Sequence, residues 1–301
     1  MATELGKFLR KLRIDADEIL LDMANKLGVA PSFLSSVENG KKRMPSAWNA
    51  RICELYALND AQKAEFERAI ANTETQIVLS FDNSDDANRE LAVAFAREYQ
   101  RLTPEQIEKM RGIMREVTLE KSESQCTSPK YRSIGLSRNQ IAEKALQLRK
   151  QTRSENIMAI DIVRFVENVL PVIFPKFDYE IAESQELKGR YAETKQSIQE
   201  NSTVLRIRED VYMNAVNGET RAIFTLAHEV GHFLLHTPSC VTICQNETSL
   251  PAYMDPEWQA NTFAGEFLVM RHLACGMSPF EIADKFHVSY SVAEIQAKYC
   301  K

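Results

Sequence analysis

Apolar residues at helical spacing dominate the first 75 residues of the chain. They fall into short segments separated by glycine, proline and charged residues, which predicts a run of short helices. The clearest segments are "ELGKFLRKLR", "EILLDMANKLG", "PSFLSSVENG" and "SAWNARICELYAL". Gly28 stands where a tight turn would end the second segment, and Ser46 is the expected cap of the fourth.

Helical spacing continues in "ANRELAVAFAREYQRL" and "PEQIEKMRGIMREV". The second of these segments opens with Thr103 and Gln106 in the positions of a capping box. The sequence then becomes rich in Ser and Lys and loses its helical period, as linkers do. We therefore expect a first domain, a helical extension that could mediate dimerisation, a linker and a second domain, over residues 1–75, 76–117, 118–137 and 138–301.

The second half of the sequence contains segments with helical spacing and segments with the alternating pattern of β-strands. It opens with a helical segment, "RNQIAEKALQLRKQ", and continues with strand-like segments, "KFDYEIAES", "GRYAETKQ" and "STVLRIRED". In the last of these, Leu205 and Ile207 alternate with arginines, which is typical of a half-buried strand. The remainder is helical. The terminal "SPFEIADKFHVSYSVAEIQAKYC", with Ser278 and Glu281 as a capping box, also resembles a helix-turn-helix, but we favour a packing role for it. This pattern predicts an α+β domain after a mainly α domain.

Composition and charge describe an ordinary soluble protein, with 44% hydrophobic and 26% charged residues and a net charge of −5. An acidic chain has no overall attraction to nucleic acid or membrane, so DNA binding must come from a local basic patch. No stretch resembles a signal peptide or a membrane span, and the six cysteines lack the density of a disulfide framework. We therefore expect a cytoplasmic protein with reduced thiols.

The candidate chemistry lies in "FTLAHEVGHFLLH", which contains three of the five histidines of the chain. His228 and His232 are four residues apart, so one helix projects both imidazoles to the same side. Glu229 can then reach a water bound by the same ion. This arrangement is typical of zinc-assisted peptide hydrolysis, with Glu229 as the general base. The alternative is an amphipathic helix with two surface histidines.

A catalytic zinc usually has three protein ligands, so a third must come from elsewhere. Glu257 is the best candidate, because it begins "EWQANTFAGEFL", where Ala260 and Ala264 permit close packing against the histidine helix. The rival ligands are Glu266, Asp255, Glu247 and His236. Manganese suits a similar site. Cys240 and Cys244 suggest a second metal site more weakly, since their segment reads as a loop.

These motifs resemble the ImmA/IrrE-type metallopeptidases from about residue 138 to 300, through "RAIFTLAHEVGHFLLH", "EWQANTFAGEFLVM" and "IADKFHVSYSVAEIQ". The resemblance implies a minimal zincin-like α+β fold with a gluzincin-like ligand set of His228, His232 and Glu257, and Glu229 as general base. It also implies cleavage of a partner repressor. The family commonly has a proline after the second motif, where this chain has Met270 and then Arg271. This departure changes a loop exit and not a ligand.

The first domain carries a second motif. In "DMANKLGVAPSFLSSVENGKKRMPS" a helix, a turn and a second helix follow at helix-turn-helix spacing. We expect Ser32 and Ser36 on the exposed face that enters the major groove, with Leu34 and Val37 facing inward. The candidate DNA contacts are Ser32, Ser35, Ser36, Lys41, Lys42 and Arg43. Three-helix packing alone gives similar apolar spacing, which is the alternative explanation.

Residues 1–75 resemble the lambda-repressor-like, Xre-type helix-turn-helix family through "LRKLR" and "SSVENGKKR". The combined expectation is a homodimeric transcription regulator that binds a double-stranded DNA operator. Its built-in metallopeptidase would cleave an Xre-type repressor, or the chain itself, to relieve repression. The alternative is a DNA-binding antitoxin or autoregulator whose peptidase-like domain binds a toxin-like partner without cleaving it. A digestive peptidase is disfavoured by the DNA-binding half.

Overall fold

The computed structural model of the chain describes residues 2–74, 103, 106, 109, 130–187, 189–197, 202–236, 241–244 and 251–300. By their contacts, Met1–Glu74 and Lys130–Lys301 form one compact unit, and Thr75–Pro129 form another. Most of the predicted extension and linker therefore lie outside the described residues. The predicted capping box is present, since Thr103 N–H donates to Gln106 Oε1 at 2.8 Å and Gln106 N–H donates to Thr103 Oγ1 at 3.3 Å.

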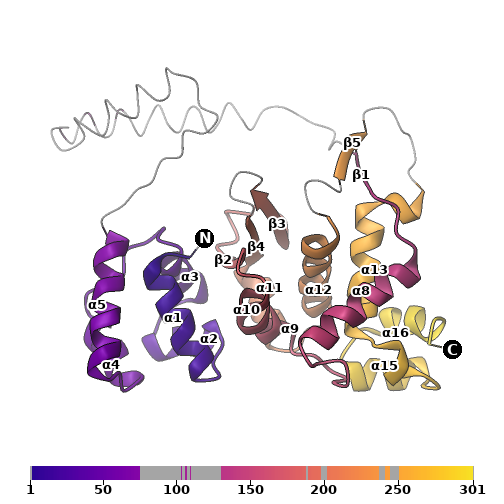
Figure 1. Cartoon of the computed structure of the whole chain (residues 1–301), viewed down its shortest axis with the longest axis horizontal. Coiled ribbons are helices and arrows are strands. Elements are labelled where there is room, and N and C mark those ends of the chain that lie inside the picture. Colours follow the sequence, from indigo (N-terminus) through magenta and orange to yellow (C-terminus); the bar gives the residue numbers. More distant parts are fainter. Residues whose placement is uncertain are drawn as a thin grey trace. The chain divides into compact units, whose positions relative to one another are not determined.

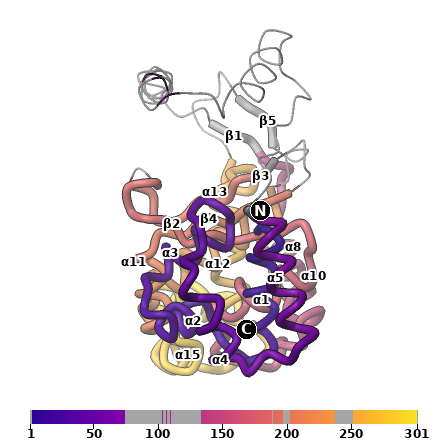
Figure 2. Tube along the Cα trace, turned by 90° about the vertical axis from the view of Figure 1, so that its left-hand side faces the viewer, coloured from indigo at the N-terminus to yellow at the C-terminus, as the bar shows by residue number. Residues whose placement is uncertain are grey.

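The first domain is a set of short helices, as predicted, and Figure 2 follows their course through the chain. They are α1 (Glu4–Asp15), α2 (Leu20–Leu27), α3 (Pro31–Glu38), α4 (Trp48–Leu55) and α5 (Asp60–Glu74). Gly28 has a φ of 72°, the left-handed conformation that the α2–α3 turn requires. Leu34 and Val37 face the core as expected. The predicted cap by Ser46 is wrong, because the N-cap of α4 is Ala47 and makes no side-chain bond.

Helices and a small sheet form the second half (Figure 1). Before the sheet come β1 (Lys130–Ser133), α8 (Arg138–Gln151), α9 (Ile162–Arg164), a π-helical turn (Phe165–Val169) and α10 (Leu170–Ile173). The next elements are β2 (Phe177–Ala182), β3 (Ala192–Ser197), β4 (Ser202–Arg208), α11 (Glu209–Val216) and α12 (Thr220–Leu235). The chain ends with β5 (Val241–Cys244), a 3-10 turn (Ala252–Met254), α13 (Pro256–Leu268), α14 (Arg271–Ala274), α15 (Pro279–Phe286) and α16 (Tyr290–Ala297).

The main sheet has the order β2-β4-β3. β2 pairs in parallel with β4, with Phe177 opposite Thr203, and β3 pairs antiparallel to β4, with Ala192 opposite Ile207. β1 and β5 form a separate antiparallel pair. The mixed sheet among helices confirms the predicted α+β class of the second half. The five helices α1 to α5 confirm the mainly α class of the first. The histidine-bearing α12 follows α11 in the chain.

α12 and α13 pack closely because small residues lie between them. A Cβ atom on Gly231 would stand 3.2 Å from both Cα and O of Ala260 and 3.2 Å from Cβ of Phe263. Ala227, Ala260 and Ala264 are buried in the same contact region. α16 then covers α13, where the buried Gln296 fills the space beside Gly265, so the terminal helices do pack as expected.

We predict that Gly231→Val destabilises the protein by about 1–3 kcal/mol, because the added methyl groups must displace α13. The predicted ligand Glu257 moves with α13, so metal affinity should fall as well. Thermal denaturation and a zinc titration measure the two effects. Thr225→Val introduces a valine at a half-exposed position of the same helix and serves as the comparison. Unchanged melting and unchanged zinc affinity would show that the close contact is unnecessary.

Candidate metal centre and helix-turn-helix surface

Three potential ligands converge between α12 and α13. His228 and His232 lie one turn apart on α12, with their Nε2 atoms 2.9 Å apart. Glu257 lies in the first turn of α13, and its Oε2 and Oε1 are each 3.4 Å from Nε2 of His228 and His232, respectively. The start of α13 is fixed by Asp255, whose Oδ1 accepts the Glu257 N–H at 3.0 Å. Among the described residues, this group could hold a metal ion.

Hydrogen bonds fix which imidazole nitrogens face the centre. Gln259 Nε2 donates to the carbonyls of Ile134 at 2.9 Å and Tyr253 at 2.7 Å, so its Oε1 must be the acceptor for His236 Nε2–H, 3.0 Å away. His236 Nδ1 is then free of hydrogen and accepts from His232 Nδ1–H at 2.9 Å. His232 Nε2 therefore carries a lone pair toward the centre.

His228 is oriented in the same way. Its Nδ1 lies 2.9 Å from Oδ1 of Asn261, an oxygen that can only accept, so the ring hydrogen is on Nδ1. The two Nε2 lone pairs then face each other at 2.9 Å, an arrangement that a cation between them stabilises. The donor set of two imidazoles and one carboxylate thus fits a zinc-type ion.

The ionisation of the carboxylate is consistent with this ligand set. The neighbouring imidazoles of His228 and His232 hold the pKa of Glu257 well below its usual range, so the carboxylate is ionised. Burial, helped by the neighbouring His232, lowers the pKa of His236 to about 4. His236 is therefore neutral near pH 7, as its role as an acceptor from His232 requires.

Glu229 lies beside the centre and contacts the edge strand. Thr194 on β3 donates to Glu229 Oε2 at 2.7 Å, and the same hydroxyl is 3.2 Å from the Glu229 carbonyl oxygen. Glu229 is buried, although it neighbours His228 in sequence. β3 thus fixes the rotamer of the candidate base from outside the histidine helix.

The predicted DNA-contact residues are placed differently from the expectation. Ser32, Ser35 and Ser36 have exposed fractions of 4%, 0% and 5%. The prediction that Ser32 and Ser36 lie on an exposed face is therefore wrong for this arrangement, because the second half of the chain covers α3. Lys41 and Lys42 follow α3 and pair with carboxylates of that half, and Arg43 comes next in the same loop.

Comparison with known protein families agrees with the family resemblance predicted for each half of the chain. Residues 182–298 match the IrrE N-terminal-like domain of the M78 peptidases, and residues 4–66 match a helix-turn-helix domain. The chain joins a helix-turn-helix domain to an IrrE-like domain. No curated protein matches the chain. Within the described residues, no helix combines the length and the apolar character needed to cross a membrane.

The rival ligands in the IrrE-like domain have other partners. Glu266 is buried and pairs with Arg138 at 3.0 Å and with Arg271 at 2.7 Å. Asp255 caps α13, and His236 bonds to the candidate ligand His232. Glu247 and Cys240 lie outside the described residues. Arg271 stands where the family commonly has a proline, and it serves as a partner of Glu266.

Sequence reasoning missed several residues around the centre. Asn261 was not singled out from the sequence, although it orients His228. His236 was named only as a rival ligand, and Gln259 was not singled out, although together they orient His232. Thr194 gave no signal, because a threonine in a short strand is ordinary and its contact with Glu229 spans 35 residues.

We predict that the purified protein binds about one equivalent of zinc and that His232→Ala loses it, because two ligands alone do not hold the ion tightly. His272→Ala, which removes an exposed histidine of α14, should leave the zinc content unchanged. Elemental analysis after dialysis measures both. Retention of zinc by His232→Ala would place the metal elsewhere.

We predict that His236→Leu weakens zinc binding about 10–100-fold, because His232 loses the acceptor that fixes its tautomer. His236→Gln should recover much of the affinity, since an amide can accept from His232 and donate to Gln259. Competition against a chromophoric chelator gives the affinities, and melting of the metal-free proteins reports any structural damage. Equal affinities for all three proteins would contradict the assigned chain of hydrogen bonds.

Proposed function

We propose that this DNA-binding regulator uses its IrrE-like domain as a zinc-dependent peptidase, with manganese as the alternative metal. The observation that supports the proposal most strongly is the convergence of His228, His232 and Glu257, with Glu229 adjacent to them. Both imidazoles are oriented by hydrogen bonds with their lone pairs toward one point. A histidine pair without a metal role would not need this orientation.

The chain's own residues divide the proposed work. When bound, the cation supplies Lewis-acid chemistry, polarising the scissile carbonyl and acidifying water. Glu229 accepts the proton from the water and delivers it to the leaving amine. Thr194 holds Glu229 Oε2, so we assign Oε1 to the proton transfer. Asn261 and His236 keep the two histidine rings in position throughout.

We propose a helix-turn-helix protein as the substrate, either an Xre-type repressor or this chain itself, cut in cis or in trans within the cytoplasm. The support is the presence of both domains on one chain, since cleavage that separates DNA binding from the rest would relieve repression. Binding as a homodimer to an operator with paired half-sites completes the proposal.

One observation favours a second candidate function. The IrrE-like domain already holds a helix-turn-helix domain through buried polar contacts, as Arg10 and Arg13 reach Tyr179. A domain that binds such a partner without cleaving it would suit an antitoxin or autoregulator, with a toxin-like protein as a further ligand. Catalysis distinguishes the two candidates, because both predict binding.

We predict that the zinc- or manganese-loaded protein generates a new N-terminus in itself or in a related helix-turn-helix repressor. Glu229→Gln should reduce the rate by about 100-fold or more, because it removes the proton acceptor while the ligands remain. Mass spectrometry identifies the products, and elemental analysis verifies that the variant keeps its metal. Metal-loaded wild type that yields no product from either protein would instead support the second candidate.

A further inference from the structure

The helix that should read DNA, α3, lies against β2 of the IrrE-like domain. β2 ends the main sheet on that side, and the Ile181 N–H on its free edge donates to Ser35 Oγ at 2.8 Å. At the other end of the helix, the Ser32 N–H donates to Glu209 Oε1 at 3.2 Å. The Ser35 hydroxyl thus bonds to protein, and Ser32, Ser35 and Ser36, with exposed fractions of at most 5%, have no access to a groove.

Carboxylates occupy the positions where phosphates would be expected. Lys41 pairs with Glu180 and, at 3.2 Å, with Glu186, while Lys42 pairs with Glu183 at 2.9 Å. Arg206 holds Glu186 at 2.7 Å and Glu180 at 3.3 Å, so this acidic surface is already in place without the lysines. It presents to the loop after α3 the same charge that a DNA backbone would.

Buried contacts anchor the two domains beside this surface. Arg10 pairs with Asp178 and donates to the Tyr179 carbonyl at 2.9 Å. Arg13 pairs with Glu38 inside its own domain and donates to Tyr179 Oη at 2.8 Å. Burial opposes the charge of Arg10, but Tyr179, Glu38 and Asp178 together raise its pKa above the usual value, so it stays cationic.

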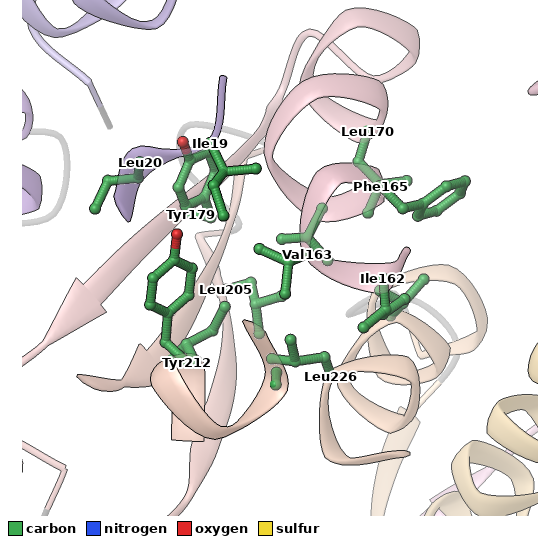
Figure 3. Close-up of a cluster of buried hydrophobic side chains, with 14 of the residues drawn as sticks. Ile19, Leu20, Ile162, Val163, Phe165, Leu170, Tyr179, Leu205, Tyr212 and Leu226 are labelled. Carbon is green, nitrogen blue, oxygen red and sulfur yellow. The ribbon is translucent and has the colours of Figure 1, made fainter. Parts of the chain in front are cut away.

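Apolar contacts and one buried carboxylate extend the anchor. Figure 3 shows Ile19 and Leu20 of the helix-turn-helix domain beside Tyr179 and Tyr212 of the IrrE-like domain. The Leu20 N–H and the Tyr212 hydroxyl both donate to Glu167, each at 2.7 Å. A contact with satisfied buried polar groups selects one relative orientation of its partners.

We propose that this face of the helix-turn-helix domain is a shared surface for two ligands, double-stranded DNA and the β2 face of the IrrE-like domain, which exclude each other. In the closed arrangement the IrrE-like domain occupies the surface, so DNA binds only the fraction of molecules that has opened. The apparent dissociation constant is then raised by the reciprocal of that fraction. The proposal rests on the DNA-binding half of the proposed function and is independent of peptidase activity.

Charge reversal on the acidic surface tests the exclusion without altering α3. The double variant Glu183→Lys with Glu186→Lys repels Lys41 and Lys42, and both glutamates are exposed, so the fold should tolerate it. Since adding positive charge strengthens DNA binding by itself, a matched control is needed. Asp284→Lys with Glu294→Lys makes the same charge change on exposed positions of α15 and α16.

Binding is measured on the full chain by fluorescence anisotropy with a mixed-sequence 30-base-pair duplex, roughly three helical turns, at low salt. We expect the surface variant to bind at least about 10-fold more tightly than the matched control. Hydrogen exchange of the 177–182 segment supplies a second readout. Saturating DNA should speed exchange there in the wild-type protein, because the free edge of β2 loses the Ser35 contact.

The outcomes separate the two proposals. Equal affinities for the surface variant and its control, or β2 exchange that saturating DNA leaves unchanged, would overturn mutual exclusion while leaving DNA binding intact. If β2 exchange shows that the surface variant is open and it still binds no duplex, DNA is not the competing ligand. That result would also remove the DNA-binding half of the proposed function, whereas the Glu229→Gln experiment would still decide peptidase activity.

Discussion

The close approach of α12 and α13 is the constraint on which the candidate centre depends. Two candidate ligands lie on one helix and the third on the other, so they converge only where the two backbones nearly touch. Gly231 against Ala260 permits that distance, since any larger pair would separate the helices. The same packing brings Asn261 and Gln259 of α13 to the histidines of α12. Ligands and their orienting partners are therefore set by a single contact.

The polar atoms behind the ligands form a continuous chain into the interior. It runs from His232 through His236 and Gln259 to backbone carbonyls at Ile134 and Tyr253. Buried polar groups are costly unless each has a partner, and here the donors and acceptors alternate without conflict. This alternation ties the tautomer of the candidate ligand His232 to the segment that follows β1, far from it in sequence.

Local rules account for what the sequence could predict. Spacing of four residues placed His228 and His232 together, and small residues indicated the helix that brings Glu257. The strands and most helices followed from periodicity. Contacts between distant segments could not be predicted this way. Thr194 is an ordinary strand residue, and nothing in its local sequence indicates its contact with Glu229. Ser35 is buried where its hydroxyl accepts an N–H from β2. Hydrophobic periodicity does not detect a polar interface, so the serine face of α3 was expected to be exposed.

The serine face and the lysines after it suit two ligands for the same physical reason. Small hydroxyl side chains fit a strand edge as well as a groove, and ammonium groups pair with carboxylates as well as with phosphates. Salt screens both sets of ion pairs, so it weakens the closed contact while it weakens DNA binding. As the salt concentration rises, the helix-turn-helix domain separates more easily from the IrrE-like domain, while its complex with DNA becomes less stable. The measured salt dependence of DNA affinity in the full chain would then be shallower than the number of phosphate contacts implies.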